Sequence, residues 1–197
     1  MDIETRKVRT FSRPACRFGY RDSIFKHEAK GRYVILTVAL SLFLPRAHRL
    51  KLDYGDIRNT LRRDGIMEPN IADVARTVAK IRMSKLPDPK VLGNSGSFFK
   101  NPEIAADVFA ALKERYPDMP RYPVSKEKIK VPAAWLIEQC GWKGKRIGDA
   151  GCHEHQALVL VNHGKASGRD ILHLAEEIRT SVHARFGIDL EPEVNIW

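Results

Sequence analysis

Apolar residues recur at intervals of three and four along three segments of the chain, which is the spacing of helices that bury one face. The three segments are residues 70–83, 105–116 and 167–186. Asn70 fits an N-cap for the first helix, and Gly187 fits the residue that ends the last one. Residues 132–140 are predicted to form a fourth helix, because Pro132 is favoured in a first turn and Gly141 follows the end.

A second pattern, with alternating or clustered Val, Ile, Leu and Thr, predicts β-strands. It covers residues 2–10, 32–44, 50–54 and 157–162, and a polar loop is expected from Gly55. The run at 32–44 predicts a long strand that is buried on at least one side. Because these strands and helices follow one another without a regular βαβ order, the sequence predicts an α+β fold.

The segment from Gly93 to Pro102 reads Gly-Asn-Ser-Gly-Ser-Phe-Phe-Lys-Asn-Pro and is dense in groups that can bind a ligand. Its glycines allow a tight turn and a close approach of the backbone to a ligand. Phe98 and Phe99 can anchor the segment to a core, while Ser97 has short polar neighbours. The residues alone leave two interpretations open: an ordinary polar loop, or a loop that places Ser97 in a site.

Basic charge is concentrated in the first half of the chain. The 197 residues carry a formal net charge of +10; residues 1–100 hold 21 Lys and Arg against 10 Asp and Glu, and residues 101–197 hold 13 against 14. This distribution favours an anionic ligand. The basic residues occur singly or in pairs and are not interleaved with aromatics, so we favour a small phosphorylated ligand and predict no nucleic-acid partner.

The cysteine content and the hydropathy of the chain predict a cytoplasmic protein that binds no metal ion. Cys16, Cys140 and Cys152 are odd in number and form no CxxC pair, so we expect reduced thiols. The run Cys152-His153-Glu154-His155 lacks further ligands at a characteristic spacing, and we predict no metal site. The longest apolar run is too short to span a bilayer and no signal peptide opens the chain, so we expect no membrane partner.

A connector and three charged residues complete the candidates. Residues 85–90 read Lys-Leu-Pro-Asp-Pro-Lys, which predicts a rigid linker, and we place a domain boundary after residue 89. Arg21 follows Gly-Tyr and suits a guanidinium held to bind a carboxylate or phosphate. Glu191 and Glu193 would face the same side of a strand, and the residues alone do not say which is buried.

Together these motifs resemble the UDP-N-acetylenolpyruvoylglucosamine reductase (MurB) family of flavoenzymes. The sequence Gly-Ser-Phe-Phe-Lys-Asn-Pro at 96–102 is similar to the family signature. Further segments resemble the family in family order, at residues 18–26, 85–90, 134–139, 157–162 and 190–194. The resemblance implies the tail of a flavin-binding α+β domain over residues 1–89 and a substrate domain with a C-terminal catalytic segment over residues 90–197.

The resemblance also implies an oxidoreductase of peptidoglycan precursor synthesis. In the family, NADPH reduces FAD, FAD passes a hydride to the enolpyruvyl group of UDP-N-acetylglucosamine enolpyruvate, and a proton completes UDP-N-acetylmuramate. Ser97 then corresponds to the proton donor, for which position matters more than acidity. Arg21 would pair with the substrate carboxylate, and Glu193, rather than Glu191, would donate a hydrogen bond to it.

Ligand contacts follow from the same resemblance. The residues expected to contact the UDP-sugar are Tyr54, Lys85, Asn101, Tyr122, Lys143 and Gln156. Lys85 and Lys143 would meet the pyrophosphate, and Tyr54 resembles the lid tyrosine found in one subgroup of the family. Arg82 is expected to contact FAD.

Most of the family's flavin-binding part lies upstream of the segment that matches Met1. We therefore expect this chain to be truncated, to hold FAD poorly and to be inactive alone, with an N-terminal flavin segment as a candidate partner. The alternative hypothesis is a non-catalytic module that binds a UDP-sugar independently of Ser97.

Overall fold

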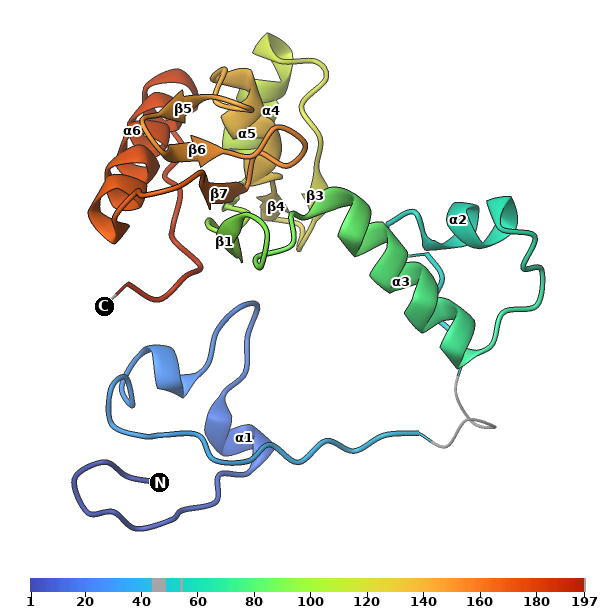
Figure 1. The fold of residues 1–197 in the computed structure, drawn as a ribbon, viewed down its shortest axis with the longest axis vertical. Helices are drawn as coiled ribbons and strands as arrows, with labels where there is room; N and C mark the ends of the chain where they lie inside the picture. Colours follow the sequence, from blue (N-terminus) through green and yellow to red (C-terminus); the bar gives the residue numbers. More distant parts are fainter. Residues whose placement is uncertain (44–48, 54, 197) are drawn as a thin grey trace. The chain divides into compact units, whose positions relative to one another are not determined.

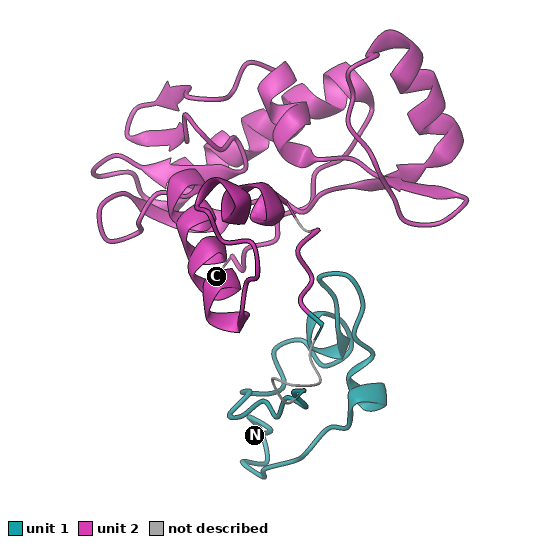
Figure 2. Cartoon of the chain, turned by 90° about the vertical axis from the view of Figure 1, so that its right-hand side faces the viewer, with its two compact units in different colours: residues 1–49 teal, residues 50–197 magenta. Residues whose placement is uncertain are grey.

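A computed structural model describes residues 1–43, 49–53 and 55–196 (Figure 1). The chain forms two compact units, residues 1–49 and residues 50–197, which Figure 2 shows in different colours. The boundary predicted after residue 89 divides the chain at another place and stays a prediction. None of the helices in the described residues has the length and apolar content needed to cross a membrane.

The first unit holds two short helices and a cluster of aromatic rings. α1 spans Arg13–Cys16, and the 3-10 helix η1 spans Ile24–Lys26. Phe11, Phe25 and Tyr33 pack edge to face, with ring centroids 5.0 to 6.2 Å apart. Such contacts between rings hold together a unit that has little regular secondary structure.

The two strands predicted in this unit are not formed. Residues 2–10 begin with a turn, in which the Asp2 carboxylate accepts hydrogen bonds from two backbone N–H groups, and a single bridge joins Asp2 to Tyr33. Residues 34–42 pair with no strand in the described chain, and their side chains are exposed. The pattern identified a segment with the composition of a buried strand, but the described residues supply no neighbouring strand to cover it.

The second unit begins with a pair of helices. α2 spans Ile57–Arg63, where a loop was predicted, and α3 spans Ile71–Lys85. The side-chain oxygen of Asn70 accepts two backbone hydrogen bonds from the first turn of α3, and the Asp73 carboxylate accepts one from the backbone N–H of Asn70. The predicted N-cap is thus confirmed. The helix α3 ends at Lys85, beyond its predicted end at residue 83.

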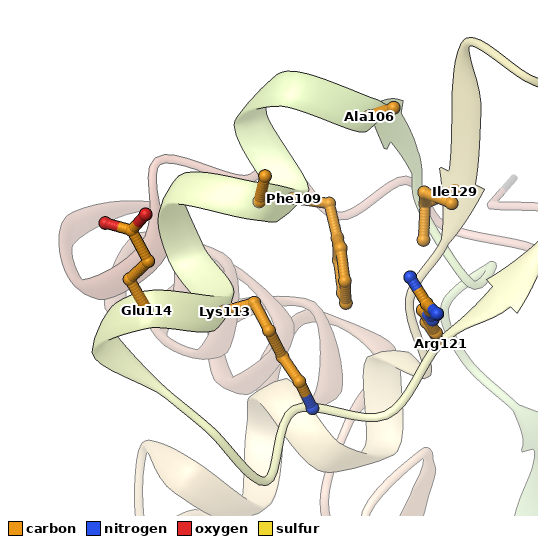
Figure 3. A pocket seen from close by; sticks show the side chains of 7 residues that line it. Ala106, Phe109, Lys113, Glu114, Arg121 and Ile129 are labelled. Atoms are coloured by element: carbon orange, nitrogen blue, oxygen red, sulfur yellow. The ribbon is translucent and has the colours of Figure 1, made fainter.

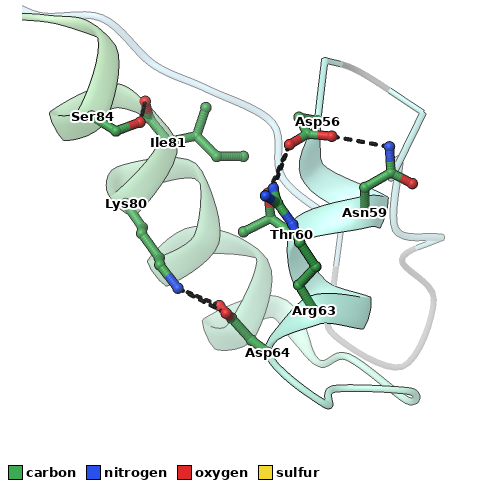
Figure 4. A network of polar contacts seen from close by, with 8 residues as sticks. All are labelled: Asp56, Asn59, Thr60, Arg63, Asp64, Lys80, Ile81 and Ser84. Atoms are coloured by element: carbon green, nitrogen blue, oxygen red, sulfur yellow. Dashed lines mark hydrogen bonds and ion pairs between the residues drawn. The ribbon is translucent and has the colours of Figure 1, made fainter.

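A network of polar side chains joins α2 and α3 (Figure 4). The Asp56 carboxylate accepts hydrogen bonds from three side chains of α2, those of Asn59, Thr60 and Arg63. These contacts, the hydrogen bond from Asn59 first, lower the pKa of Asp56 below its ordinary value. Lys80 of α3 donates to both oxygens of Asp64 at 2.8 Å, which ties the two helices together.

A four-stranded antiparallel sheet with the order β1-β7-β6-β5 forms the centre of this unit. The strands are β1 Gly93–Ser97, β5 Arg146–Ile147, β6 Ala150–Cys152 and β7 Val159–Asn162. α6, Gly168–Phe186, contacts β6, β7 and α5, Ala133–Gln139. The predicted strand at 157–162 and the last two predicted helices are confirmed, whereas β1 occupies a segment that its composition had indicated to be a loop.

A smaller antiparallel sheet with the order β2-β4-β3 lies beside α4. Its elements are β2 Glu103–Ala105, α4 Ala106–Arg115, β3 Tyr122–Pro123 and β4 Lys128–Lys130. One hydrophobic core joins both sheets and three helices; its large, fully buried side chains include Phe99, Met119, Leu136, Ile137, Leu174, Ile178 and Leu190. The arrangement is the predicted α+β fold.

Ser167→Ala is expected to lower the free energy of unfolding by about 1 kcal/mol, the usual effect of removing an N-cap. The Ser167 hydroxyl accepts from the backbone N–H of Asp170 at 3.3 Å, and the Asp170 carboxylate accepts from the backbone N–H of Ser167 at 2.7 Å. Urea unfolding measures the loss. Thr180→Ala, at an exposed position of the same helix, is the control, and an equal loss there would contradict the capping role.

The cap formed by Ser167 and Asp170 also predicts that the free energy of unfolding depends on pH. Hydrogen bonds from the Ser167 side chain and backbone hold the pKa of Asp170 below its ordinary value. The stabilisation by ionised Asp170 is therefore fully present above an ordinary carboxyl pKa of about 4, and it is lost as pH falls through the lower pKa of the folded state. We expect the difference in stability between the wild type and Ser167→Ala to shrink with acidification over this range.

Candidate functional site

Ser97 is the last residue of β1, directly after an irregularity in the strand. Its backbone pairs with Val159 of β7, and the register shifts between Asn94 and Ser97. Gly96 has a φ of 77°, a left-handed conformation that favours glycine, so this residue lets the strand change direction before Ser97. Composition had suggested a loop here because it could not distinguish a glycine in a turn from a glycine in a bulged strand.

Phe98 and Phe99 anchor the chain immediately after Ser97. They are 5% and 1% exposed, and their ring centroids lie 5.1 Å apart in an edge-on arrangement. The backbone N–H of Phe98 donates to the carbonyl of Leu158 at 2.7 Å. The predicted anchoring role of the two phenylalanines is confirmed, and it fixes the backbone of the half-buried Ser97 against the core.

The C-terminal segment brings Glu193 to the same place. The backbone N–H of Glu193 donates to the carbonyl of Phe98 at 2.8 Å, and the N–H of Lys100 donates to the carbonyl of Glu191 at 2.9 Å. Glu193 is half-buried, whereas Glu191 is exposed and forms an ion pair with the Lys100 ammonium at 2.9 Å. Glu191 and Glu193, between which the sequence alone could not decide, therefore differ in burial and in their contacts.

Gln156 belongs to the loop between β6 and β7, next to the end of β1. Its carbonyl accepts from the N–H of Val159 at 3.0 Å, and its side-chain oxygen accepts from the N–H of Leu158 at 3.4 Å. Because Leu158 in turn accepts from Phe98, this loop is joined to the strand that carries Ser97. Three predicted site residues, Ser97, Gln156 and Glu193, thus lie on adjoining segments at one end of the larger sheet.

Asn101 has a structural contact that sequence reasoning missed. Its side-chain oxygen accepts a hydrogen bond at 2.9 Å from the N–H of Ala133, the first residue of α5. Pro132 stands at the N-cap of α5 and makes no side-chain cap of its own. The cap comes from a residue far away in the sequence, so no local pattern could have revealed it.

The remaining predicted contacts are exposed side chains. Tyr122 in β3 is 59% exposed, and Lys143 pairs with Glu138 at 3.0 Å. Lys85 lies in the last turn of α3, and Arg82 is exposed on the same helix. These residues stand on α3, on β3 and in the turn between α5 and β5, and among the described residues no hydrogen bond or ion pair joins them to Ser97.

Two of the predicted site residues, Arg21 and Tyr54, are not among the described residues of the second unit. Arg21 belongs to the first unit, in a tight turn closed by paired hydrogen bonds between the backbones of Gly19 and Asp22. Its φ of 55° is uncommon for a residue with a side chain, so the turn holds Arg21 in a strained conformation. Tyr54 lies outside the described residues, and residues 50–53, predicted with it as a strand, form none.

The cysteine and histidine run does not assemble a cluster of metal ligands. In the described ranges, no group of three or more His, Cys, Asp or Glu side chains could hold a metal ion. Cys152 is buried and its thiol donates to the carbonyl of Ala157, and burial raises the pKa of Cys152 to about 12. Burial and the nearby His155 lower the pKa of His153. At neutral pH, Cys152 is therefore a neutral core thiol.

A hollow of about 390 Å³ lies beside α4, apart from these residues (Figure 3). Phe109 and Ile129 are among its apolar lining, with Arg121 and Lys113 at its sides. The Arg121 guanidinium stands 6.0 Å from the centre of the Phe109 ring, and the Lys113 ammonium donates to the carbonyl of Met119. None of the predicted site residues that the structure describes lines it.

The sequence of the chain matches known proteins. The family model described as "UDP-N-acetylenolpyruvoylglucosamine reductase, C-terminal domain" matches residues 88–197, more than half of the chain. The chain belongs to this family. The resemblance inferred from the motifs is confirmed, and the matched region contains β1, α4, both sheets and the C-terminal segment.

Relatives in the MurB family match over nearly the whole chain. The UDP-N-acetylenolpyruvoylglucosamine reductase of Chromobacterium violaceum is 55% identical over 93% of this chain and 53% of its own length. Those of Flavobacterium johnsoniae and Pseudomonas aeruginosa are each 50% identical over 100% of this chain, and over 58% and 57% of their own lengths. The chain thus spans about half the length of the curated relatives it matches.

A solved MurB structure, from Thermus caldophilus, is similar to a lesser degree. It is 25% identical, covers 64% of this chain and 35% of its own, and superposes with a TM-score of 0.39. Membership of the family rests on the sequence matches and not on this superposition.

Asn101→Ala is expected to lower the free energy of unfolding by roughly 1–3 kcal/mol, because the buried N–H of Ala133 loses its acceptor. Asn101→Asp keeps an acceptor oxygen and should lose less. Urea unfolding of both variants gives the comparison. Asn195→Ala, at an exposed position of the C-terminal segment, is the control, and an Asn101→Ala protein as stable as this control would refute the capping role.

Proposed function

We propose that this chain supplies the substrate-binding and proton-donating part of an enzyme that reduces UDP-N-acetylglucosamine enolpyruvate to UDP-N-acetylmuramate in the cytoplasm. The net reaction adds a hydride and a proton across the enolpyruvyl double bond, and NADPH is the ultimate reductant. Family membership supports the reaction class, and the relatives named above are UDP-N-acetylenolpyruvoylglucosamine reductases.

The observation that carries the proposal is the hydrogen bond between the backbones of Glu193 and Phe98, at 2.8 Å. It joins the residue after Ser97 to the segment that carries the carboxyl group. A hydroxyl and a carboxyl that belong to distant parts of the sequence are thereby held on adjacent backbones, both half-buried. The closeness of the two backbones supports the proposed pairing of a proton donor with an enol-stabilising acid.

Ser97 donates its proton to the carbon next to the substrate carboxylate. A serine hydroxyl is a weak acid, but the enolic intermediate that it quenches is far more basic than water. Placement therefore decides the rate. The bulge before Ser97 and the buried Phe98 and Phe99 after it supply that placement.

Arg21 and Glu193 bind the substrate carboxylate and the enol that forms from it. Arg21 contributes a fixed positive charge and paired donors for two carboxylate oxygens. Glu193, in its protonated form, donates a hydrogen bond to the developing oxyanion.

The UDP-sugar contacts the cations and polar groups predicted from the resemblance. Lys85 and Lys143 bind the pyrophosphate, for which Lys143 exchanges its exposed ion pair with Glu138. The nucleotide-sugar contacts Tyr54, Asn101, Tyr122 and Gln156. For Asn101 this role uses the amide N–H₂ group, because the side-chain oxygen is engaged by α5.

The described residues do not by themselves fit FAD. A flavin needs an enclosed and largely apolar site. Arg82, the residue expected to contact FAD, is exposed on α3, and the hollow of about 390 Å³ beside α4 does not include it. The proposal therefore assigns to this chain the substrate and the proton, and it assigns the reduced flavin to another polypeptide segment.

Residues 34–42 are the part of this chain that the flavin-binding segment contacts in this proposal. They are extended and uncharged, and their large side chains are 44% to 82% exposed. Such a segment is stabilised when neighbouring strands bind its backbone and cover both of its faces. We infer that a flavin-binding segment, of the kind that lies outside the matched region in the longer relatives, supplies these strands and that the chain is inactive without it.

The chain mixed with the unmatched segment of the Pseudomonas aeruginosa relative, FAD and substrate is expected to consume NADPH. Ser97→Ala should lower this rate by roughly 10²- to 10⁴-fold, the range for loss of a general acid. Ser95→Ala, at an exposed position of the same strand, is the matched control and should keep the rate. Absorbance of NADPH follows the reaction.

Two results would count against the proposed function. Equal rates for Ser97→Ala and the wild type would remove Ser97 as proton donor. UDP-sugar binding that survives Ser97→Ala, without NADPH consumption in the complemented mixture, would support the non-catalytic binding module instead.

Leu40→Lys is expected to weaken binding of the flavin-binding segment at least about tenfold, because a lysine there must enter an apolar strand interface. Leu40 is 75% exposed, so the substitution leaves the stability of the isolated chain unchanged. Val8→Lys, in the same unit and 72% exposed, is the control for added charge. Calorimetric titration measures both, and equal binding by the two variants would place the interface elsewhere.

A further inference from the structure

Asn94 makes three hydrogen bonds around the irregular part of β1. Its side-chain oxygen accepts from the N–H of Gly96 at 3.0 Å. Its amide N–H₂ group donates to the carbonyls of Leu92 at 2.8 Å and Pro87 at 3.2 Å. The side chain is half-buried. An asparagine is well suited to this position, because one short side chain must offer an acceptor and two donors.

These contacts surround a β-bulge. Asn94 pairs with Val161 and Ser97 with Val159, so β1 advances by three residues while β7 advances by two. The extra residue is accommodated by the left-handed Gly96, whose φ is 77°. Because side chains alternate between the two faces of a strand, one extra residue decides on which face the next side chain stands. The bulge therefore sets the direction of Ser97.

We propose that Asn94 is a positioning residue for Ser97: it holds the bulge that directs the Ser97 hydroxyl toward the substrate. The inference rests on the proposed function, in which Ser97 donates the proton. The hydrogen bonds of the Asn94 side chain go to backbone groups, and in this role it acts through the backbone at Gly96.

The bond to Pro87 adds a second constraint. Pro87 belongs to the connector that follows α3, and Lys85 stands at the end of that helix. Asn94 thus links the strand of the proton donor to the connector beside a proposed pyrophosphate ligand. A shift of this connector is transmitted to the bulge through one amide group.

Asn162 on the neighbouring strand offers a matched control. Its side-chain oxygen accepts from the N–H groups of Gly164 and Ala166 at 3.0 and 3.1 Å, and its amide donates to the carbonyl of Ala166 at 2.7 Å. It is half-buried in the same sheet, opposite Gly93. Asn162→Ala therefore removes as many hydrogen bonds as Asn94→Ala, but none of them is at the bulge.

The test compares the two alanine variants. A crystal structure of Asn94→Ala is expected to show a changed bulge and a displaced Ser97 side chain, and the amide of Gly96 should exchange faster with solvent. In the complemented assay, kcat should fall roughly 10- to 100-fold, since small misplacement of a reacting group has effects of this size. KM for the UDP-sugar should change less than about threefold. Asn162→Ala should keep kcat and the position of Ser97 while losing similar thermal stability.

Each alternative outcome is decisive. An unchanged Ser97 position in Asn94→Ala overturns the proposal, and so does an equal loss of kcat in both variants. If the wild type and Asn162→Ala consume no NADPH with the partner segment, the proposed function fails. The crystal structures and amide exchange still decide whether Asn94 places Ser97 in that case.

Discussion

Two backbone hydrogen bonds fix the end of the chain to the strand that carries Ser97. The N–H of Lys100 donates to Glu191, and the N–H of Glu193 donates to Phe98. Phe99 and Leu190, which adjoin the bonded residues in the sequence, are buried, and an unpaired backbone group in such surroundings would be costly. The arrangement of the larger sheet, α6 and the returning segment depends on this closure. Arg179 of α6 strengthens it by donating to the carbonyl of Leu190 at 2.9 Å.

The helices were predictable because their signals are local. The cap at Asn70 and the stop at Gly187 are read from neighbouring residues, and the structure contains both. α2 was missed because five of its seven residues are Arg, Asn or Thr, which leaves only Ile57 and Leu61 as an apolar stripe. Its stability comes from the pairing of α2 with α3, which no local pattern records.

Strands and site depend on distant residues, and prediction was correspondingly poorer. β3 and β5 have two residues each, too few for alternation to be visible. The polar composition of β1 concealed a strand, while the apolar composition of residues 34–42 indicated a strand that has no neighbour in the described chain. The candidate site residues came from the family resemblance, and the structure brings together Ser97, Gln156 and Glu193. The cap that Asn101 provides for α5 could be found only in three dimensions.

The uncovered residues 34–42 have a consequence for the life of the protein in a cell. An uncharged, proline-free stretch with many β-branched residues has the composition of segments that stack into cross-β aggregates. Within the described chain the backbone of Val34 is bonded to Met1, and no strand pairs with the residues that follow it, which leaves their backbone open to a second copy. With the covering strands proposed above, the solubility and abundance of the chain would depend on how quickly this stretch is covered. The half-life of the chain would report on assembly before any catalytic assay does.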